Sequence, residues 1–296
     1  MSKEKKKNIL KSKKNIKIGK FEISLKLTII IGIIAVVSII GVIIFINLSK
    51  TVKPLYDSNN NPVYIKEQYK NDIYSNADIY KGQFIDVAGQ VYNIKTEEDI
   101  TMIQINADVE NATDNTLIYY KGSLKVTEED YIKVTGYILG TVEYENMIGG
   151  VVSAPVIVAT DLEKSTYIEV VRPTIKEVIY SDKVINQRDY EIKINKIEFA
   201  EKETRIYVEA SNKAKDDFSI YTYSSVVTQN GNQYDQESNY DADYRELNSE
   251  LKPGVTSDGI ITFPAIQQKD FVLIIEGSSD DWDIDLEEYK FNLEIK

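Results

Sequence analysis

The sequence predicts a mainly β protein, in which one N-terminal transmembrane helix precedes a five-stranded barrel and a β-sandwich. Three observations lead to this prediction. The run from Leu27 to Ile46 is uncharged and apolar, the later chain alternates apolar and polar residues in short stretches, and the 296 residues include no Cys and no His. Alternation with a period of two is typical of half-buried strands, and a chain of this length has room for about two domains.

Residues 1–26 form a basic tail, and residues 27–46 are predicted to span a membrane. The tail has ten Lys and two Glu, a net charge of +8, whereas the whole chain carries −12, which leaves −20 for the remainder. A helix of this length, at about 1.5 Å per residue, matches the roughly 30 Å apolar core of a bilayer. Because lysines beside a span stay in the cytoplasm, we expect the tail inside the cell and the C-terminal domains outside it, at the cell membrane.

A cleaved signal peptide is the alternative interpretation of this apolar run. Such a peptide has an apolar core of about 7 to 15 residues, followed by an A-x-A-like cleavage site. The run here is longer, and the NLSKTVKPL that follows it has no such site and no cysteine for a lipid. We therefore expect an uncleaved anchor.

Residues 47–71 are predicted to be a spacer with one short helix. The polar, turn-forming stretch DSNNNP indicates a segment that holds the domains off the membrane. Between Tyr64 and Tyr74, the side chains of Tyr69 and Ile73 are four positions apart. That spacing is typical of one face of a short amphipathic helix.

Residues 72–166 are predicted to form a barrel. Five strand-like stretches follow one another, at residues 80–91, 100–107, 116–122, 131–144 and 151–162. Gly89 lies on the apolar face of the first stretch, and Gly136 and Gly140 lie on that of the fourth. A strand that curls round a small barrel needs a sharp bend, which glycine at a bulge supplies without a Cβ clash. Five short strands with such bends predict a five-stranded Greek-key barrel of the OB type.

This region also resembles a known group of domains. The stretches NADIYKGQFIDVAGQV and VTGYILGTVEYENMIGGVVSAPVIVATDLE are similar to the OB-fold domains of Gram-positive surface proteins. The similarity extends over residues 72–163. It implies an OB-like barrel at the cell surface and supplies no activity.

A linker is predicted at residues 167–182, and a second β domain at residues 183–296. In YEIKINKIEF the apolar positions change side near Lys196, which predicts a bulge. ETRIYVEASN and FNLEI alternate, whereas FVLIIE is continuously apolar and is expected to be a buried strand. Turn-forming stretches such as QNGNQY and LKPGVTSDG separate these strands, which favours a β-sandwich.

The second domain resembles a family as well. NKIEFAEKETRIYVEASNKAKDDFSIY, LKPGVTSDGIITFP and EGSSDDWDIDLEEYKF are similar to the immunoglobulin-like (telokin-like) extracellular domain of unknown function 4352. The resemblance implies a secreted or surface-anchored sandwich. It supplies no catalytic residues.

Both β domains are acidic, which argues against nucleic acid as a partner. Residues 76–166 have 15 acidic and 6 basic side chains, and residues 183–296 have 24 and 13. Barrels of the OB type that bind nucleic acid need a basic groove with stacking aromatic rings, because neutralising phosphate supplies most of the affinity. Tyr119 and Tyr120 are the stacking candidates, but the charge predicts no nucleic-acid partner.

Two acidic stretches are candidate calcium sites. The first has the spacing of positions 1, 3, 5 and 12 of an EF-hand loop and comprises Asn239, Asp241, Asp243 and Glu250. Tyr244, however, stands where that loop requires glycine. The second set alternates without a glycine and comprises Asp281, Asp283 and Asp285. Solvated acidic loops are the ordinary interpretation of both stretches, so we expect no metal and no other cofactor.

No motif predicts an enzyme. Ser249 and Lys252 have Ser-x-x-Lys spacing, but Pro253 disfavours the helix that such a pair uses. We therefore expect a non-catalytic, membrane-anchored binding or scaffolding protein of the bacterial cell envelope, whose partner is an envelope protein or a peptide. The alternatives are a membrane-bound regulator or sensor that signals through the basic tail, and an envelope hydrolase.

Overall fold

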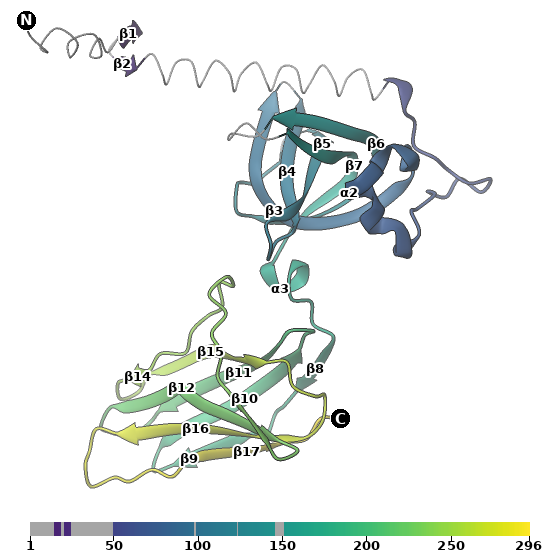
Figure 1. Cartoon of the computed structure of the whole chain (residues 1–296). Helices are drawn as coiled ribbons and strands as arrows, with labels where there is room; N and C mark the ends of the chain where they lie inside the picture. The colour runs from purple at the N-terminus through teal and green to yellow at the C-terminus, as the bar shows by residue number, and fades with distance from the viewer. Residues whose placement is uncertain (1–14, 19–20, 25–49, 98, 123, 146–150) are drawn as a thin grey trace, which may run out of the picture.

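The computed structural model describes residues 15–18, 21–24, 50–97, 99–122, 124–145 and 151–296. The described chain is mainly β and contains a closed barrel and a two-sheet sandwich (Figure 1). In the basic tail, β1 (Asn15–Ile18) pairs antiparallel with β2 (Phe21–Ser24). The transmembrane helix predicted from Leu27 to Ile46 lies outside the described residues. Among those that are described, no helix has the length and apolar character needed to cross a membrane.

Residues 50–65, which we call the strap, are hydrogen-bonded to the barrel. The N–H of Leu55 donates to the carbonyl oxygen of Gly82 at 2.8 Å, and Tyr64 forms a parallel bridge with Phe84. The spacer expected here is therefore not free. Its backbone groups find partners on the edge of the barrel, which is more favourable than leaving them half-desolvated beside it.

A helical segment follows the strap and consists of η1 (Glu67–Asp72), α2 (Ile73–Asn76) and η2 (Ala77–Tyr80). The helix predicted between residues 64 and 74 thus begins three residues later than expected. Ile73 is buried, but Tyr69 is 42% exposed, so the two do not share a buried face. In a 3₁₀ turn, side chains three positions apart are aligned, not those four apart, which explains this difference.

Five strands close the barrel: β3 (Phe84–Glu97), β4 (Ile100–Asp108), β5 (Thr113–Lys121), β6 (Tyr131–Glu145) and β7 (Val151–Ser165). Their order around the barrel is β3-β4-β5-β7-β6, and β6 pairs back onto β3. All neighbours are antiparallel except β5 and β7, which run parallel. This topology fits the predicted OB-type barrel.

Two glycines face the interior where backbones of different strands nearly touch. A Cβ atom on Gly89 would lie 2.4 Å from the carbonyl oxygen of Asn106, and one on Gly136 would lie 2.3 Å from that of Val158. Neither glycine has a positive φ. Their shared requirement is space, because any side chain would push a neighbouring backbone away.

The register shifts only partly coincide with the predicted glycines. In β3 the shift lies between Val91 and Asn93, so the bulge expected at Gly89 is displaced by two residues. In β6 one shift lies next to Gly136, and the other ends at Gly140, whose φ is +135°. Strand β6 is thus bent at both of its predicted glycines, whereas β3 bends just after its own.

The sandwich consists of two sheets. One sheet has the order β15 (Thr256–Pro264), β11 (Glu203–Asn212), β10 (Tyr190–Phe199) and β8 (Lys176–Ile179), with β9 (Val184–Gln187) also paired to β10. The other has the order β13 (Asn232–Asp235), β12 (Phe218–Gln229), β16 (Phe271–Ser279) and β17 (Tyr289–Leu293), with β14 (Glu250–Leu251) also paired to β12. Figure 1 shows the two sheets stacked face to face, which fits an immunoglobulin-like sandwich.

The two sheets enclose one continuous apolar core. The bulge predicted near Lys196 is confirmed, because the register of β10 shifts between Ile194 and Lys196. Strand β16 differs from the prediction. Val272 and Ile274 are only half-buried, so this strand has one core face and one partly covered face instead of being buried on both.

A short segment joins the domains. Helix α3 (Tyr167–Val170) follows β7 and leads to β8, which pairs with β10 although it lies inside the predicted linker of residues 167–182. An edge strand of four residues is too short to give a clear pattern of alternation. The sandwich therefore begins earlier than expected.

Side chains from both domains meet at this junction. The ring of Tyr167 packs edge-on against Tyr131 of the barrel and Tyr244 of the sandwich, with centroid distances of 5.8 and 6.0 Å. Glu110, in the turn between β4 and β5, forms an ion pair with Arg172. The junction is therefore a packed contact between the domains.

Candidate functional site

The end of the sandwich away from the barrel carries an exposed tryptophan. Trp282 is the single Trp of the chain and is 99% exposed, in the loop between β16 and β17. The N–H of Asp280 donates to the carbonyl oxygen of Asp217 at 3.0 Å, which places this loop beside the β11–β12 turn. The opposite end of β11 adjoins Lys202, which pairs with Glu110 of the barrel. Figure 1 shows β11 within the sandwich, below the barrel. We call residues 213–217, 250–255 and 280–288 the distal end.

Hydrogen bonds fix the loop that holds the tryptophan. The N–H groups of Asp283 and Ile284 both donate to Asp281, to its side-chain and carbonyl oxygens, at 3.0 Å each. The side chain of Gln187 donates to the carbonyl oxygen of Glu287 at 2.8 Å and accepts from its N–H at 2.9 Å. Ile284 also packs against the core. The indole is therefore held out into solvent by an anchored loop.

Carboxylates flank Trp282 in the sequence. Asp280 and Asp283 are exposed, and neither has an ion-pair partner within the part of the chain that the structure describes. An indole face attracts cations, and a free carboxylate beside it can accept hydrogen bonds from the same Lys or Arg. Exposed Trp residues are also among the commonest energetic anchors of protein interfaces. The distal end thus has the chemistry of a contact for a cationic side chain.

The second predicted calcium set lies in this loop without forming a metal site. Asp281 uses its carboxylate to cap the N–H of Asp283, and both Asp283 and Asp285 are exposed. Glu250 of the first set pairs with Lys252 at 2.5 Å. Among the described residues, no three acidic side chains are placed to hold a metal ion together.

The first predicted calcium set is dispersed. Asn239 donates its side-chain amide to Glu203 Oε2 at 2.9 Å and to the hydroxyl of Tyr167 at 3.1 Å. Its side-chain carbonyl oxygen accepts the N–H of Asp241 at 3.2 Å, and Asp243 is exposed. Asn239 is therefore part of the domain junction and does not present a ligand oxygen to a shared site.

A buried charged network lies behind this junction, centred on Arg205. The guanidinium is fully buried and donates to Glu198 at 2.9 Å, to Glu203 at 2.6 Å and to Thr174 at 2.8 Å. Burial alone would lower the pKa of Arg205, but its hydrogen bonds to Glu203 and Glu198 raise it. A buried charge whose donors are paired in this way is structural.

The Ser-x-x-Lys pair lacks catalytic geometry. Ion pairs with Asp217 and Glu250 raise the pKa of Lys252, although a lysine must be neutral to act as a base. Glu250 itself lies in the extended strand β14, so Ser249 and Lys252 are not on a helix. This arrangement gives no support to a Ser-Lys nucleophile.

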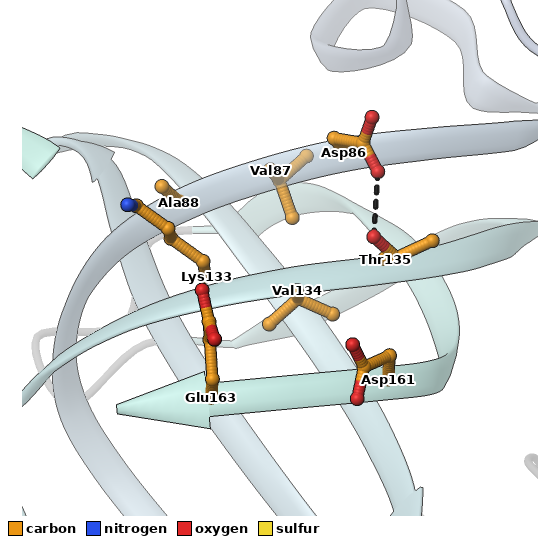
Figure 2. Close-up of a pocket in the computed structure, with 8 residues that line it drawn as sticks. All are labelled: Asp86, Val87, Ala88, Lys133, Val134, Thr135, Asp161 and Glu163. Carbon is orange, nitrogen blue, oxygen red and sulfur yellow. Dashed lines mark hydrogen bonds between the residues drawn. The ribbon is translucent and has the colours of Figure 1, made fainter. Parts of the chain in front are cut away.

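The barrel carries a surface groove of about 330 Å³ across three neighbouring strands. Figure 2 shows its lining, which is Asp86, Val87 and Ala88 of β3, Lys133, Val134 and Thr135 of β6, and Asp161 and Glu163 of β7. Thr135 donates its hydroxyl to Asp86 at 2.6 Å, and Lys133 pairs with Glu169 at 3.1 Å. Thr135 and Asp86 are thus engaged with each other, and Lys133 is engaged with a residue outside the lining. The exposed carboxylates of Asp161 and Glu163 are the remaining charged groups of the groove.

The tyrosines considered for base stacking are poorly placed. Tyr119 is 2% exposed and packs with Leu117, Leu139 and Val156. This burial raises the pKa of Tyr119 to about 12. Tyr120 is half-buried. Tyr119 therefore presents no open ring face to a base.

Sequence reasoning missed the residue that defines the distal end. It singled out Asp281, Asp283 and Asp285 for their spacing and passed over Trp282 between them. The available signal was the DDWDID stretch itself, because a bulky aromatic residue with an acid directly on each side has no adjacent apolar side chain with which to be buried.

Comparison with known proteins adds little to this picture. No protein-family model and no curated protein matches the chain. Among solved structures, the chain is similar to "a functionally unknown protein from Listeria monocytogenes EGD-e", with 11% sequence identity and a TM-score of 0.36. The match covers 45% of this chain and 94% of that one. A likeness this distant identifies neither a function nor a fold.

Proposed function

We propose that this chain is a single-pass, membrane-anchored protein of the bacterial cell envelope that binds or scaffolds a cationic protein or peptide and does not catalyse a reaction. The observation that carries the proposal is the 99% exposed Trp282 beside Asp283, an exposed carboxylate that forms no ion pair among the described residues. The tail of net charge +8 and the apolar run after it support an anchor with its N-terminus in the cytoplasm. The resemblance to extracellular domain 4352 supports a position outside the cell.

The charge of the β domains supports the choice of a cationic partner. The chain after the tail carries a net charge of −20, so long-range forces bring positive partners toward it and keep nucleic acid and other polyanions away. Long-range attraction alone gives little affinity. Contact with the indole adds short-range, orientation-dependent energy, and this makes the distal end the preferred place of binding.

The direct test uses Trp282 as its own reporter. The full chain in detergent micelles is titrated with a lysine-rich peptide, a glutamate-rich peptide and single-stranded DNA, and the intrinsic fluorescence is followed at low and high salt. We expect only the lysine-rich peptide to change the emission, with an affinity that falls as salt rises. DNA bound to the basic tail would leave the emission unchanged, because Trp282 is on another part of the chain.

Matched variants distinguish the distal end from general acidity. Asp283→Asn should weaken binding of the lysine-rich peptide several-fold, whereas Glu276→Gln, an exposed carboxylate change within β16, should not. Equal weakening by both changes would show that only net charge matters, and the proposed contact at Trp282 would then be rejected.

Membrane topology has its own test. Protease added to intact, wall-free cells should remove residues after the predicted span and spare the lysine-rich tail. A soluble domain released without protease, starting shortly after Ile46, would show instead that the apolar run is a cleaved signal peptide.

A further inference from the structure

The described chain after the predicted span begins at Lys50, four residues after Ile46, and at once forms the strap on the barrel. Backbone hydrogen bonds of 2.8 to 2.9 Å tie it to the barrel, from Leu55 N–H to Gly82, from Phe84 N–H to Val63 and from Ile65 N–H to Phe84. The strap is therefore a fixed part of the barrel surface, located where the chain would leave a membrane.

Three apolar or aromatic side chains of the strap are exposed. Leu55 is 45% exposed, Tyr56 48% and Tyr64 43%. Both tyrosine rings pack on the same buried ring of Phe84, with centroid distances of 5.6 and 5.8 Å. The two tyrosines therefore lie on one side of the barrel, and each keeps part of its ring in solvent.

Lysines border this group. Lys53 and Lys66 are both exposed, and within the described part of the chain neither has an ion-pair partner. Lys66 lies two residues after Tyr64 in extended backbone, so its side chain projects toward the same side as that ring. Lys53 lies two residues before Leu55 in the strap. We call Lys53, Leu55, Tyr56, Tyr64 and Lys66 the strap face. It is basic and aromatic on a barrel that otherwise has a net charge of −9 over residues 76–166.

The length of chain outside the described residues limits how far this face can be from a bilayer. Leu55 is nine positions after Ile46, so even a fully extended chain spans only about 30 Å between them. A tether this short keeps the strap face at high effective concentration next to the lipid headgroups.

We propose that the strap face rests on the outer surface of the bilayer that holds residues 27–46. Tyr side chains prefer the boundary between headgroups and acyl chains, and lysines extend their ammonium groups to lipid phosphates. The acidic remainder of the barrel faces away from the anionic surface, which orients the domain. This inference rests on the proposed membrane anchor, and it adds a defined contact between the barrel and the lipid.

Single-tryptophan variants of the full chain test the contact. The chain carrying Tyr56→Trp and Trp282→Phe is reconstituted in vesicles of phosphatidylcholine and anionic phosphatidylglycerol, with and without lipids brominated near the top of the acyl chain. We expect brominated lipid to quench the indole emission from position 56 about twofold, as for an interfacial residue, and to leave Trp282 of the unaltered chain unquenched. Adding Leu55→Asp and Tyr64→Asp should remove the quenching at position 56 while the chain still floats with the vesicles.

Each outcome decides between the anchor and the contact. A chain that floats with the vesicles but shows no quenching at position 56 overturns the strap contact and leaves the anchor intact. A chain that does not float overturns the anchor and the inference with it. Equal quenching at positions 56 and 282 also overturns the inference, because it means that the molecule lies on lipid without the proposed orientation.

Discussion

The barrel buries its apolar residues in three clusters of seven, six and four residues, whereas the sandwich buries twenty-two in one. Consecutive residues of β6, Ile138 and Leu139, belong to different clusters, because alternate side chains of a strand point to opposite faces. The barrel strands also approach closely at Gly89 and Gly136. The flatter sheets of the sandwich leave room for a continuous layer. Local steric fit therefore limits the stability of the barrel, and the sandwich depends on a shared interior.

The two domains also differ in the polar side chains that they bury. Among the described residues, the barrel buries only Thr101 and Thr116. The sandwich buries Arg205 with Glu198 and Glu203, together with several polar side chains. Buried charges are costly unless every one is paired, so the sandwich has a sensitive point that the barrel lacks.

Removing the buried guanidinium should have the largest effect. Arg205→Met leaves Glu198 and Glu203 buried without their cation, which should destabilise the sandwich by about 4 kcal/mol. Hydrogen exchange of β10 and β11 amides, followed in the intact chain, would measure this. Arg245→Met removes an exposed ion pair with Asp258 and should change the same amides by no more than about 0.5 kcal/mol. Equal effects of the two changes would refute the distinction between buried and exposed pairs.

A side chain at position 89 should have the next largest effect on stability, and it should destabilise the barrel and not the sandwich. Gly89→Val places atoms against the backbone at Asn106, which should destabilise the barrel by roughly 3 kcal/mol. Exchange of β3 and β4 amides should accelerate, while that of β10 and β11 stays unchanged.

A glycine without close neighbours provides the control for this change. Gly231 has a φ of +81° and open space around it, so Gly231→Ala should cost the sandwich only about 1 kcal/mol. If Gly89→Val is no worse, close packing of the barrel backbone is not what limits its stability.

A smaller difference in stability between the two domains is expected in acid. Burial alone would raise the pKa of Glu198, but hydrogen bonds from Lys196, Arg205 and Tyr207 outweigh it and hold that pKa below its ordinary value of 4.5. A carboxyl with a lowered folded-state pKa stabilises above its unfolded pKa, and this stabilisation is lost as pH falls through the folded value. We expect the sandwich to lose stability as the pH falls below about 4.5, and Glu198→Gln to flatten this dependence. If stability depends on pH in the same way with and without Glu198, this carboxyl is not the source of the acid sensitivity.

The smallest effect on stability is expected at the distal end. Trp282→Ala removes a side chain that is 99% exposed and should change the free energy of unfolding by no more than about 0.5 kcal/mol. Thermal unfolding checks this, and peptide binding by the same variant should fall. A large loss of stability would mean that the indole packs on the sandwich and is not free for a partner.

Patterns within single strands were sufficient to predict most of the fold. The five barrel strands and the bulge at Lys196 follow from alternation, which is a local property. Contacts between distant segments were not predictable. The spacing of Asn239 suggested a calcium loop, but its partners are Glu203 and Tyr167, far away in the sequence. The strap likewise resembles a spacer until its bonds to the barrel are known.

The parallel pairing of β5 with β7 fixes an order in time. Residues 117–119 of β5 pair with residues 156–158 of β7. During synthesis from the N-terminus, the barrel can therefore close only after β7, its last strand, has been made. The sandwich is completed later still, because Tyr207 of β11 pairs with Ile260 of β15, which is made after the whole barrel. During that interval a nascent chain carries a finished barrel and an unpaired β11 edge, which is the stage at which it is most prone to pair with another chain.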